Sequence, residues 1–393
     1  IAIEGTSDDD VLGGTTLSDR IYGFDGDDVL NGGEGRDHMA GGKGDDTYFV
    51  GDSHGSGGRR AWFVGAELDT VVELSDEGWD SVFVTTSYTL PDHVESLTLA
   101  GSSAADGTGN ALNNVIMGNG RGNVLSGLEG DDFLSGGDGV DLLRGGRGVD
   151  ILQGGDSADF LRDANGIGLF DGGAGVDVLS GNDENSALIG GAGADLIGVG
   201  AGHDIVLYNL GEGADVISAT PGQSDTLSLG GGIAYDDLTL RKRGRNLILK
   251  TGRHDSVTFT DWYASPENQT VANLQVIVEA MAEFSASSTD PLLDKKIHTF
   301  DFRAIVDAFD ESRGRRSWSR EWDVMDALLD AHLGASDNEA LGGDIAYRYG
   351  LNGSLAGIGV TAVQDVLNAP QFGSAAQTLR PIEELQQGLT RLS

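Results

Sequence analysis

The sequence predicts a mainly β protein, in which short parallel strands stack into a solenoid in two blocks, followed by a β-rich cap and an α-helical C-terminal region. Three observations predict it: a glycine-rich period of nine residues, an apolar residue at a fixed place in each period, and changes of pattern after residues 207 and 264. The period is clearest at 127–150, where it reads Gly-Gly-x-Gly-x-Asp-x-(apolar)-x.

Each nine-residue repeat, or nonad, contains the parts of one turn and one strand. Glycines accept positive φ and let the chain turn tightly with its carbonyl groups pointing inward. The Asp at the sixth place adds a carboxylate, and the apolar residue at the eighth place points to the opposite side from it, as strand alternation requires. Because two nonads complete one coil, residues eighteen apart are expected to stack on one edge.

Composition limits the classes of protein that this chain represents. Its 393 residues allow two or three domains. The net charge of -38 and the 63 glycines both oppose collapse, so a disordered acidic chain is the alternative interpretation. Disorder does not need an apolar residue at every ninth position. At this charge nucleic acid is not an expected partner. The absence of cysteine fits secretion without a disulfide-forming step, and fits a cytosolic protein equally.

The first predicted block covers residues 1–50 and contains five nonads. The sixth positions are Asp10, Asp19, Asp28, Asp37 and Asp46. The eighth positions are Leu12, Ile21, Leu30, Met39 and Tyr48. The first two nonads lack most of the glycines, as a terminal capping repeat does.

Residues 51–108 break the period and form a predicted connecting segment. Runs of β-branched and aromatic residues near 69–73, 80–90 and 94–99 predict longer strands that continue the solenoid. Gly51-Asp-Ser-His-Gly matches the Gly-x-Ser-x-Gly motif of hydrolases. That motif requires a following helix, and a Gly/Ser/Arg loop follows here, so we interpret the match at Ser53 as coincidence.

The second predicted block covers residues 109–207 and holds eleven nonads without an insertion. The sixth positions are Asn114, Asn123, Asp132, Asp141, Asp150, Asp159, Gly168, Asp177, Ser186, Asp195 and Asp204. The eighth positions are Ile116, Leu125, Leu134, Leu143, Leu152, Leu161, Phe170, Leu179, Leu188, Ile197 and Val206. The apolar row continues where the Asp is lost, so the core is maintained independently of the acidic row.

The last two predicted segments are a β capping module at 208–264 and a helical region at 265–393. Short alternating strands separated by glycine turns indicate the first. In the second, Ser265-Pro266 begins a predicted helix that runs through Met281. Further helices are expected near 301–312, 317–334, 361–368 and 381–391. The sequence has no apolar run of the ~18 residues that would span a membrane.

The nonads resemble the calcium-binding repeats of the RTX (repeats-in-toxin) family, which form a parallel β-roll at the C-terminal part of secreted Gram-negative proteins. The resemblance implies several bound Ca²⁺ ions, export by type I secretion machinery, and a secreted or cell-surface location. It also places an uncleaved secretion signal around Leu379 to Ser393 and the parent activity upstream of Ile1. The metal ligands that it implies are Asp10, Asp19, Asp28, Asp37, Asp46, Asp132, Asp141, Asp150, Asp159, Asp177, Asp195 and Asp204.

Stacking at an interval of eighteen predicts an asymmetry in the second block. One edge carries Asp141, Asp159, Asp177 and Asp195, whereas the other is interrupted by Gly168 and Ser186. Since a glycine offers no side chain and a serine only a neutral hydroxyl, we expect a continuous row of ions on the first edge and a gap on the second.

Three classes of function remain open from the sequence. The first is a non-enzymatic calcium-binding and secretion region that folds outside the cell. The second is an adhesion or partner-binding module, because 265–393 is more apolar than an export signal requires and suits a host or cell-surface partner. The third is an enzyme, which the sequence does not favour, since no two histidines have the His-Glu-x-x-His spacing of zinc proteases.

Overall fold

The computed structural model describes residues 1–51, 69–218, 220, 224–315 and 321–393. The chain divides into two compact units, Ile1–Gly146 and Arg147–Ser393, and each is described by itself. The domain boundaries predicted from the pattern changes stay predictions.

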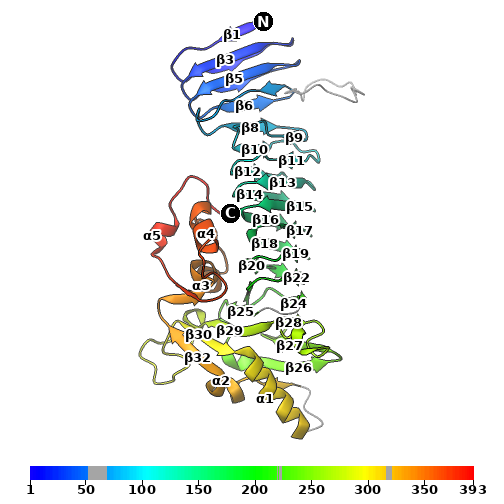
Figure 1. Cartoon of the computed structure of the whole chain (residues 1–393), viewed down its shortest axis with the longest axis vertical. Coiled ribbons are helices and arrows are strands. Elements are labelled where there is room, and N and C mark those ends of the chain that lie inside the picture. Colours follow the sequence, from blue (N-terminus) through cyan, green and yellow to red (C-terminus); the bar gives the residue numbers. More distant parts are fainter. Residues whose placement is uncertain (52–68, 219, 221–223, 316–320) are drawn as a thin grey trace. The chain divides into compact units, whose positions relative to one another are not determined.

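The first unit is built from short strands that stack in parallel (Figure 1). Strands β1, β3, β5 and β7 form one sheet, β2, β4, β6, β8, β10, β12 and β14 a second, and β9, β11, β13 and β15 a third. Leu12 pairs with Leu30 and Arg20 with His38, so the interval of eighteen is confirmed. The strands are β1 (Ala2–Glu4), β2 (Val11–Gly13), β3 (Arg20–Asp25), β4 (Val29–Asn31), β5 (His38–Lys43), β6 (Thr47–Val50), β7 (Thr70–Val71), β8 (Ser81–Val84), β9 (Tyr88–Thr89), β10 (Ser96–Leu99), β11 (Gly107–Thr108), β12 (Val115–Met117), β13 (Val124–Glu129), β14 (Phe133–Asp138) and β15 (Leu142–Arg147).

The second unit continues the same pattern and then changes to antiparallel pairing. Strands β16, β18, β20, β23 and β25 stack in parallel, as do β17, β19, β22, β24 and β28. In the first of these sheets, β29 still pairs in parallel with β25, and β30 and β32 follow in antiparallel pairing. In the second, β27, β26 and β31 follow β28 in antiparallel pairing. The strands are β16 (Val149–Asp156), β17 (Phe160–Arg162), β18 (Ile167–Gly175), β19 (Val178–Ser180), β20 (Ser186–Ile189), β21 (Ala192–Gly193), β22 (Leu196–Gly198), β23 (Ile205–Asn209), β24 (Ala214–Ser218), β25 (Asp225–Gly230), β26 (Thr239–Arg243), β27 (Asn246–Lys250), β28 (Ser256–Phe259), β29 (Val271–Ile277), β30 (Ile297–Asp301), β31 (Trp322–Asp323), β32 (His332–Ser336), β33 (Glu339–Leu341) and β34 (Ala376–Thr378).

The eighth-position residues form the interior of both units. From Ile21 to Val206, every one of them is at most 2% exposed, and only Leu12, in the first nonad, is half-buried. The fold class predicted from the period is therefore confirmed: a mainly β parallel solenoid with a helix-containing C-terminal region.

The connecting segment continues the solenoid with strands that are shorter than predicted. Within 69–108 the strands have two to four residues, and the run 80–90 is divided into β8 and β9 by a bend. The corners of the solenoid explain the difference, because each coil must turn before a longer strand can form. The Ser53 motif lies outside the described residues.

The helix predicted to follow Ser265 is wrong. Pro266 begins only a 3-10 turn, Pro266–Asn268, and Val271–Ile277 is the strand β29. This strand pairs with β25 and β30, and both α1 (Phe302–Arg315) and α3 (Gly343–Asn352) pack against it. A strand covered in this way is apolar along most of its length, so some of its residues also fit a helical spacing.

The other predicted helices exist with different lengths. The first, predicted at 301–312, is α1 (Phe302–Arg315), and the one predicted at 361–368 is α4 (Val360–Leu367). Residues 317–320 of the helix predicted at 317–334 lie outside the described residues, and within 321–334 the helix is α2 (Met325–Ala331). The helix predicted at 381–391 is the shorter α5 (Ile382–Leu385), and α3 was not predicted. Two further 3-10 turns lie at Tyr235–Asp237 and Val278–Ala280. In the described part of the chain, no helix is long and apolar enough to cross a membrane.

The C-terminal segment of the second unit packs on one sheet of its solenoid. Helix α4 packs against β16 and β18, and α3 packs against β23 and β25 (Figure 1). The amide of Gln364 donates to the carbonyl of Val149, and the hydroxyl of Ser393 donates to Oε1 of Gln153, at 3.1 and 2.9 Å. At the seventh nonad position this covered sheet presents buried apolar residues, among them Ile151 and Leu169.

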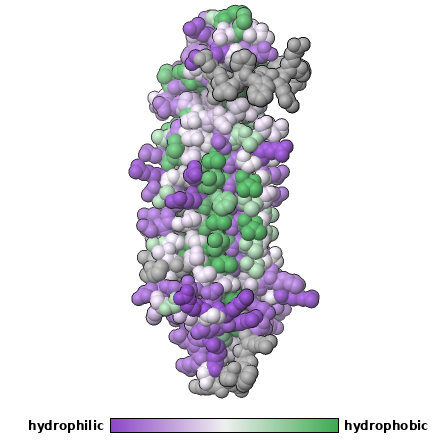
Figure 2. All heavy atoms as spheres, turned by 90° about the vertical axis from the view of Figure 1, so that its right-hand side faces the viewer, coloured by the Kyte–Doolittle hydropathy of each residue, from purple (hydrophilic) through white to green (hydrophobic). Residues whose placement is uncertain are grey.

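The opposite sheet of the same unit leaves its seventh positions exposed or half-buried. Phe160 and Leu196, in β17 and β22, are 48% and 45% exposed. Figure 2 shows hydrophobic side chains gathered along this face, which carries the strands on the right of Figure 1. The seventh position is therefore apolar on both sheets, and the C-terminal segment decides which of the two is buried.

A charge in the interior row should weaken calcium-induced folding. Leu143, at an eighth position, is fully buried, whereas Leu128 is 46% exposed near the end of β13, with φ +88°. Leu143→Asp places an unpaired carboxylate in an interior one side chain thick, which costs several kcal/mol. We expect it to raise the calcium concentration needed for folding, measured by circular dichroism. Leu128→Asp is the control, and equal effects of the two would contradict the assigned register.

Candidate metal sites

The sixth-position residues form hydrogen-bonded ladders along the edges of the solenoid. In the second unit, the backbone N–H of Asp159 donates to Oδ1 of Asp177, and that of Asp177 donates to Oδ1 of Asp195, at 2.7 and 2.8 Å. The first unit repeats this pattern, for example from Asp28 to Oδ1 of Asp46 at 2.8 Å. Each carboxylate is thus held in place by the backbone of the coil before it.

Burial separates one predicted ligand from the other eleven. Asp10 is half-buried, whereas each of the others is at most 3% exposed. Among the described residues, several of these buried carboxylates have an Oδ2 atom without a hydrogen-bond partner; they are Asp28, Asp37, Asp46, Asp177, Asp195 and Asp204. An unpartnered, buried carboxylate oxygen is costly unless a cation or a proton neutralises it.

Except at Asp204, whose nonad begins with Val199, the first glycine of the nonad leaves room beside these oxygen atoms. A Cβ on Gly172 would lie 2.6 Å from Oδ2 of Asp177 and 2.6 Å from the carbonyl oxygen of Gly190, one coil later. The carboxylate and the carbonyl therefore converge on space that any side chain would fill. The second glycine is required for a different reason, since Gly173 has φ +93°.

In the first two nonads, the carboxylate accepts hydrogen bonds from a threonine of the same nonad. Oδ2 of Asp19 accepts from both the backbone N–H and the hydroxyl of Thr15, at 2.6 and 2.8 Å, and Thr6 does the same for Asp10. Threonine replaces the second glycine in both nonads. Asp10 and Asp19 accordingly offer fewer free oxygen atoms than the later ligands, and they stay predictions with less structural support.

At the start of the second block, asparagine stands at the sixth position, where most later nonads have aspartate. The side-chain amide of Asn123 donates to the carbonyl of Ala105 at 2.5 Å, while its Oδ1 accepts from the backbone of Asn119 at 2.8 Å. The Nδ2 of Asn114 likewise donates to the carbonyl of Val94 at 3.3 Å. The amide oxygen accepts a hydrogen bond as a carboxylate oxygen would. The amide nitrogen donates to a carbonyl oxygen that a cation would otherwise contact.

The edge that lacks acidic residues is filled by other groups. Gly168 stacks between Asp150 and Ser186, as the interval of eighteen requires. A Cβ on Gly168 would lie 2.3 Å from the ring of Phe170, so this ring occupies the space. The predicted gap in the row of ions faces this position and stays a prediction.

Four aspartates of the ladders were missed because they lie outside the nonads. Asp69 accepts from the backbone of Asp37 at 2.9 Å, and Asp80 accepts from that of Asp46 at 2.9 Å. Asp215 and Asp225 extend the two ladders in the second unit. Each begins an Asp-x-(apolar) pattern whose apolar residue lies in a strand. This pattern is the second half of a nonad, and it was the signal that could have identified them.

Burial and like charges raise the pKa of these carboxyl groups. Burial raises the pKa of Asp177 to about 6, and the charge of Asp195 adds to the shift, although the N–H donated by Asp159 opposes it. Burial and the charge of Asp225 raise the pKa of Asp204 to about 9. No ion pair among the described residues involves Asp177 or Asp195. Carboxylate and carbonyl oxygen atoms without a protein cation fit Ca²⁺.

Comparisons with known proteins agree with this chemistry. The family model described as RTX calcium-binding nonapeptide repeat (4 copies) matches residues 4–39, 13–48, 108–143, 135–162 and 171–206. The fold and the sites thus define a parallel β-solenoid of calcium-binding repeats. The matched ranges of this chain are similar to RTX nonapeptide repeats.

A solved structure gives a further, weaker likeness. The extracellular lipase LipA from Serratia marcescens is 20% identical, with a TM-score of 0.15, and the match covers 69% of this chain and 39% of the lipase. The chain thus spans about two fifths of the lipase that it matches, and at this TM-score the likeness carries no argument. A search of curated proteins gave no match.

The space beside the first glycine provides a direct test of calcium binding. In Gly172→Ala, the new methyl group would clash with Oδ2 of Asp177 and the carbonyl of Gly190, and overpacking of this kind costs about 1–3 kcal/mol. We expect calcium affinity to fall about ten- to hundredfold, measured by titration calorimetry. Gly198→Ala is the matched control, because its methyl group would lie 3.6 Å or more from any neighbour. Equal affinities in the two variants would contradict the assigned site.

Acid should replace calcium in stabilising the fold. The pKa values of Asp46, Asp177 and Asp215 are raised to about 7, 6 and 7 in the folded state. Protonation of these groups therefore stabilises the fold fully at a pH below their unfolded pKa values. This stabilisation is lost as the pH rises through their folded pKa values. In chelator, circular dichroism should show more folded protein at a pH of about 5 than at about 8. The opposite order would refute the argument.

Proposed function

We propose that this chain is the calcium-binding RTX region of a secreted protein, and that it folds on calcium outside the cell. The observation that carries the proposal is the row of buried carboxylates, whose Oδ2 atoms have no partner among the described residues. The net charge of -38 acts in the same direction, because repulsion between acidic groups opposes a compact metal-free state.

In this proposal, the difference in calcium concentration between the cytosol and the outside of the cell controls folding. Extracellular calcium modules bind with dissociation constants of about 10⁻⁴–10⁻³ M, which is far above the calcium level of a bacterial cytosol. The chain therefore stays unfolded inside the cell and passes through type I secretion machinery in that state. Outside, calcium binding and folding are one process, because the stacked sites do not exist in the unfolded chain.

The position of the expected secretion signal supports this order of events. Within residues 379–393, Arg380 pairs with the buried Asp344 at 2.8 Å, and Leu385 and Leu392 are at most 3% exposed. Ser393 contacts Gln153 in the solenoid of the same unit. Packed in this way, the segment is accessible to an exporter only before the chain folds.

The activity of the secreted protein belongs to other parts of it. We assign no catalytic step to this chain, whose buried carboxylates are held by backbone N–H groups instead of being aimed at a substrate cleft. In this proposal the solenoid supports secretion and the stability of an upstream effector.

The adhesion or partner-binding alternative has less support. The apolar faces of α3 and α4 are used in packing on the solenoid of their own unit, where α4 contacts β16 and β18. A partner that binds through 265–393 would therefore meet the remaining exposed residues, such as Leu329 and Leu333, which are 63% and 60% exposed.

Calcium should drive a folding transition in the full chain. At a pH of about 7.5, where most raised carboxyl groups are charged, chelator should leave the protein expanded. Adding about 1–5 mM Ca²⁺ should give a compact β protein, measured by circular dichroism and hydrodynamic radius. Mg²⁺ is the control, because its octahedral shell dehydrates reluctantly and should not replace calcium. An identical compact state in excess chelator would refute the proposed function.

A further inference from the structure

The connecting segment places a carboxylate where the repeats place a glycine. Parallel pairing aligns Gly5 with Gly23 and Gly23 with Gly41, which are the first glycines of successive nonads on this edge. The pairing of Met39 with Val71 continues the column to Glu73. The backbone N–H of Gly41 donates to Oε1 of Glu73 at 3.3 Å, so the side chain turns back toward the preceding coil.

The same coil also receives a carboxylate from the ladder. Thr47 pairs with Ser81, which places Asp80 one coil after Asp46. The backbone N–H of Asp46 donates to Oδ1 of Asp80 at 2.9 Å, as in the nonads. Asp80 in turn holds its place by donating its own backbone N–H to Oε2 of Glu95 at 2.8 Å.

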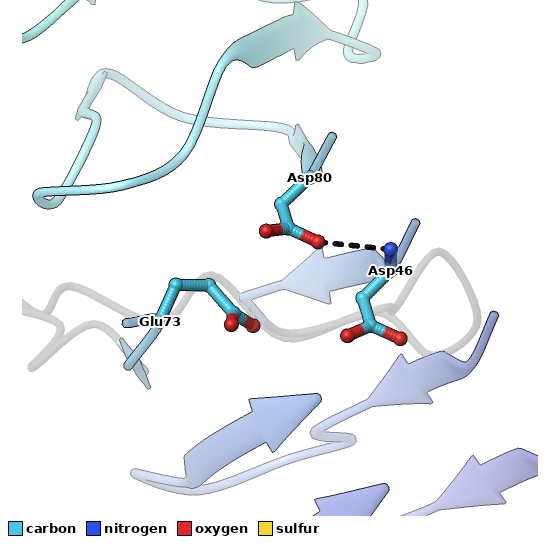
Figure 3. Close-up of side chains that lie close together, drawn as sticks. All are labelled: Asp46, Glu73 and Asp80. Atoms are coloured by element: carbon cyan, nitrogen blue, oxygen red, sulfur yellow. Dashed lines mark hydrogen bonds between the residues drawn. The ribbon is translucent and has the colours of Figure 1, made fainter. Parts of the chain in front are cut away.

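Three carboxylates therefore converge at the end of the first block. Asp46, Glu73 and Asp80 each place one oxygen atom within 4.8 Å of the other two (Figure 3). All three are buried, at 1%, 5% and 1% exposure. Of the described residues, none forms a hydrogen bond to Oδ2 of Asp46, Oε2 of Glu73 or Oδ2 of Asp80. Figure 3 shows the three carboxylate groups facing a common space.

The surroundings hold Glu73 in position without neutralising it. The hydroxyl of Tyr48 donates to Oε1 of Glu73, and the backbone N–H of Gly41 donates to the same hydroxyl oxygen at 2.6 Å. No lysine or arginine in the described part of the chain forms an ion pair with any of the three carboxylates. Burial, and then the charges of Asp80 and Asp46, raise the pKa of Glu73 to about 9.

We propose that Asp46, Glu73 and Asp80 form a divalent-cation site for Ca²⁺ at the end of the first block, in which Glu73 and Asp80 of the connecting segment are added to the predicted nonad ligand Asp46. In the nonad sites one carboxylate meets carbonyl groups, whereas three carboxylates meet here. Calcium affinity rises with the number of charged ligands, so this site binds more tightly than the repeats and fills first. It joins the connecting segment to the first block, because its ligands come from both. The proposal rests on the proposed calcium-dependent function.

The alternative occupant is a proton. A protonated Glu73 would remove one charge from the cluster, as two carboxylates that share a site often require. The variant Glu73→Gln distinguishes a bound ion from a bound proton. Glutamine keeps the size of the side chain and mimics the neutral acid, so it preserves a proton-stabilised cluster and weakens a calcium site.

The test counts ions on the full chain. Calcium bound per chain is measured by equilibrium dialysis at saturation and at low free calcium, with circular dichroism to confirm folding. We expect Glu73→Gln to bind one ion fewer than the wild type and to lose the tightest phase of the titration. Glu4→Gln is the matched control, since Glu4 is an exposed residue of β1 in the same unit. We expect it to keep the wild-type count.

The outcomes separate this site from the proposed function. If the wild type binds several ions and Glu73→Gln binds the same number with the same affinities, this site is refuted and the calcium-dependent function stands. If the wild type binds no calcium, the proposed function is refuted as well. Should Glu73→Gln fail to fold in calcium, the shorter Glu73→Asp replaces it. For this variant a tenfold weaker tightest phase is expected, and an unchanged titration overturns the site.

Discussion

The stacking of one buried carboxylate above another is the constraint on which the rest of this structure depends. In the ladders, a sixth-position Asp is fixed through Oδ1 by the backbone of the preceding coil, for example Asp177 by Asp159. This bond sets the register of the coils and leaves Oδ2 aimed at the space beside the first glycine, where Gly172 has no side chain. The same bond that orders the solenoid therefore concentrates negative charge inside it, and stability becomes dependent on what neutralises that charge.

The interior is too thin to offset this charge by hydrophobic burial. One apolar residue per nonad, such as Leu143 or Leu161, forms the whole core of each half-coil. Where the chain avoids the need for an ion, it does so by a local exchange of groups. Thr15 satisfies the carboxylate of Asp19, and the side-chain amide of Asn123 takes the place of a carboxylate together with its cation.

Along one edge of the second unit, apolar packing takes the place of the acidic side chains. The sixth positions Gly168 and Ser186 lack a carboxylate, and the neighbouring seventh positions, Leu169 and Ala187, are at most 1% exposed. Helix α4 packs against β18 beside them. The other sheet has the same apolar seventh positions and leaves Phe160 exposed (Figure 2). The two sheets therefore differ in what covers them more than in their own sequence.

The sequence by itself determined whatever repeats with a fixed period. The register, the interior row and the column of Asp residues follow from an interval of nine, because strand alternation and glycine turns act within a few residues. Only the tertiary structure decided the places where distant segments meet. Glu73 lies beside Asp46 because β5 pairs with β7 at an offset of 32 residues, which brings Glu73 next to Gly41. Val271–Ile277 is a strand because β25 and β30 supply its hydrogen bonds. Such pairings are set by the loops and neighbours that fix each offset, and no local pattern records them.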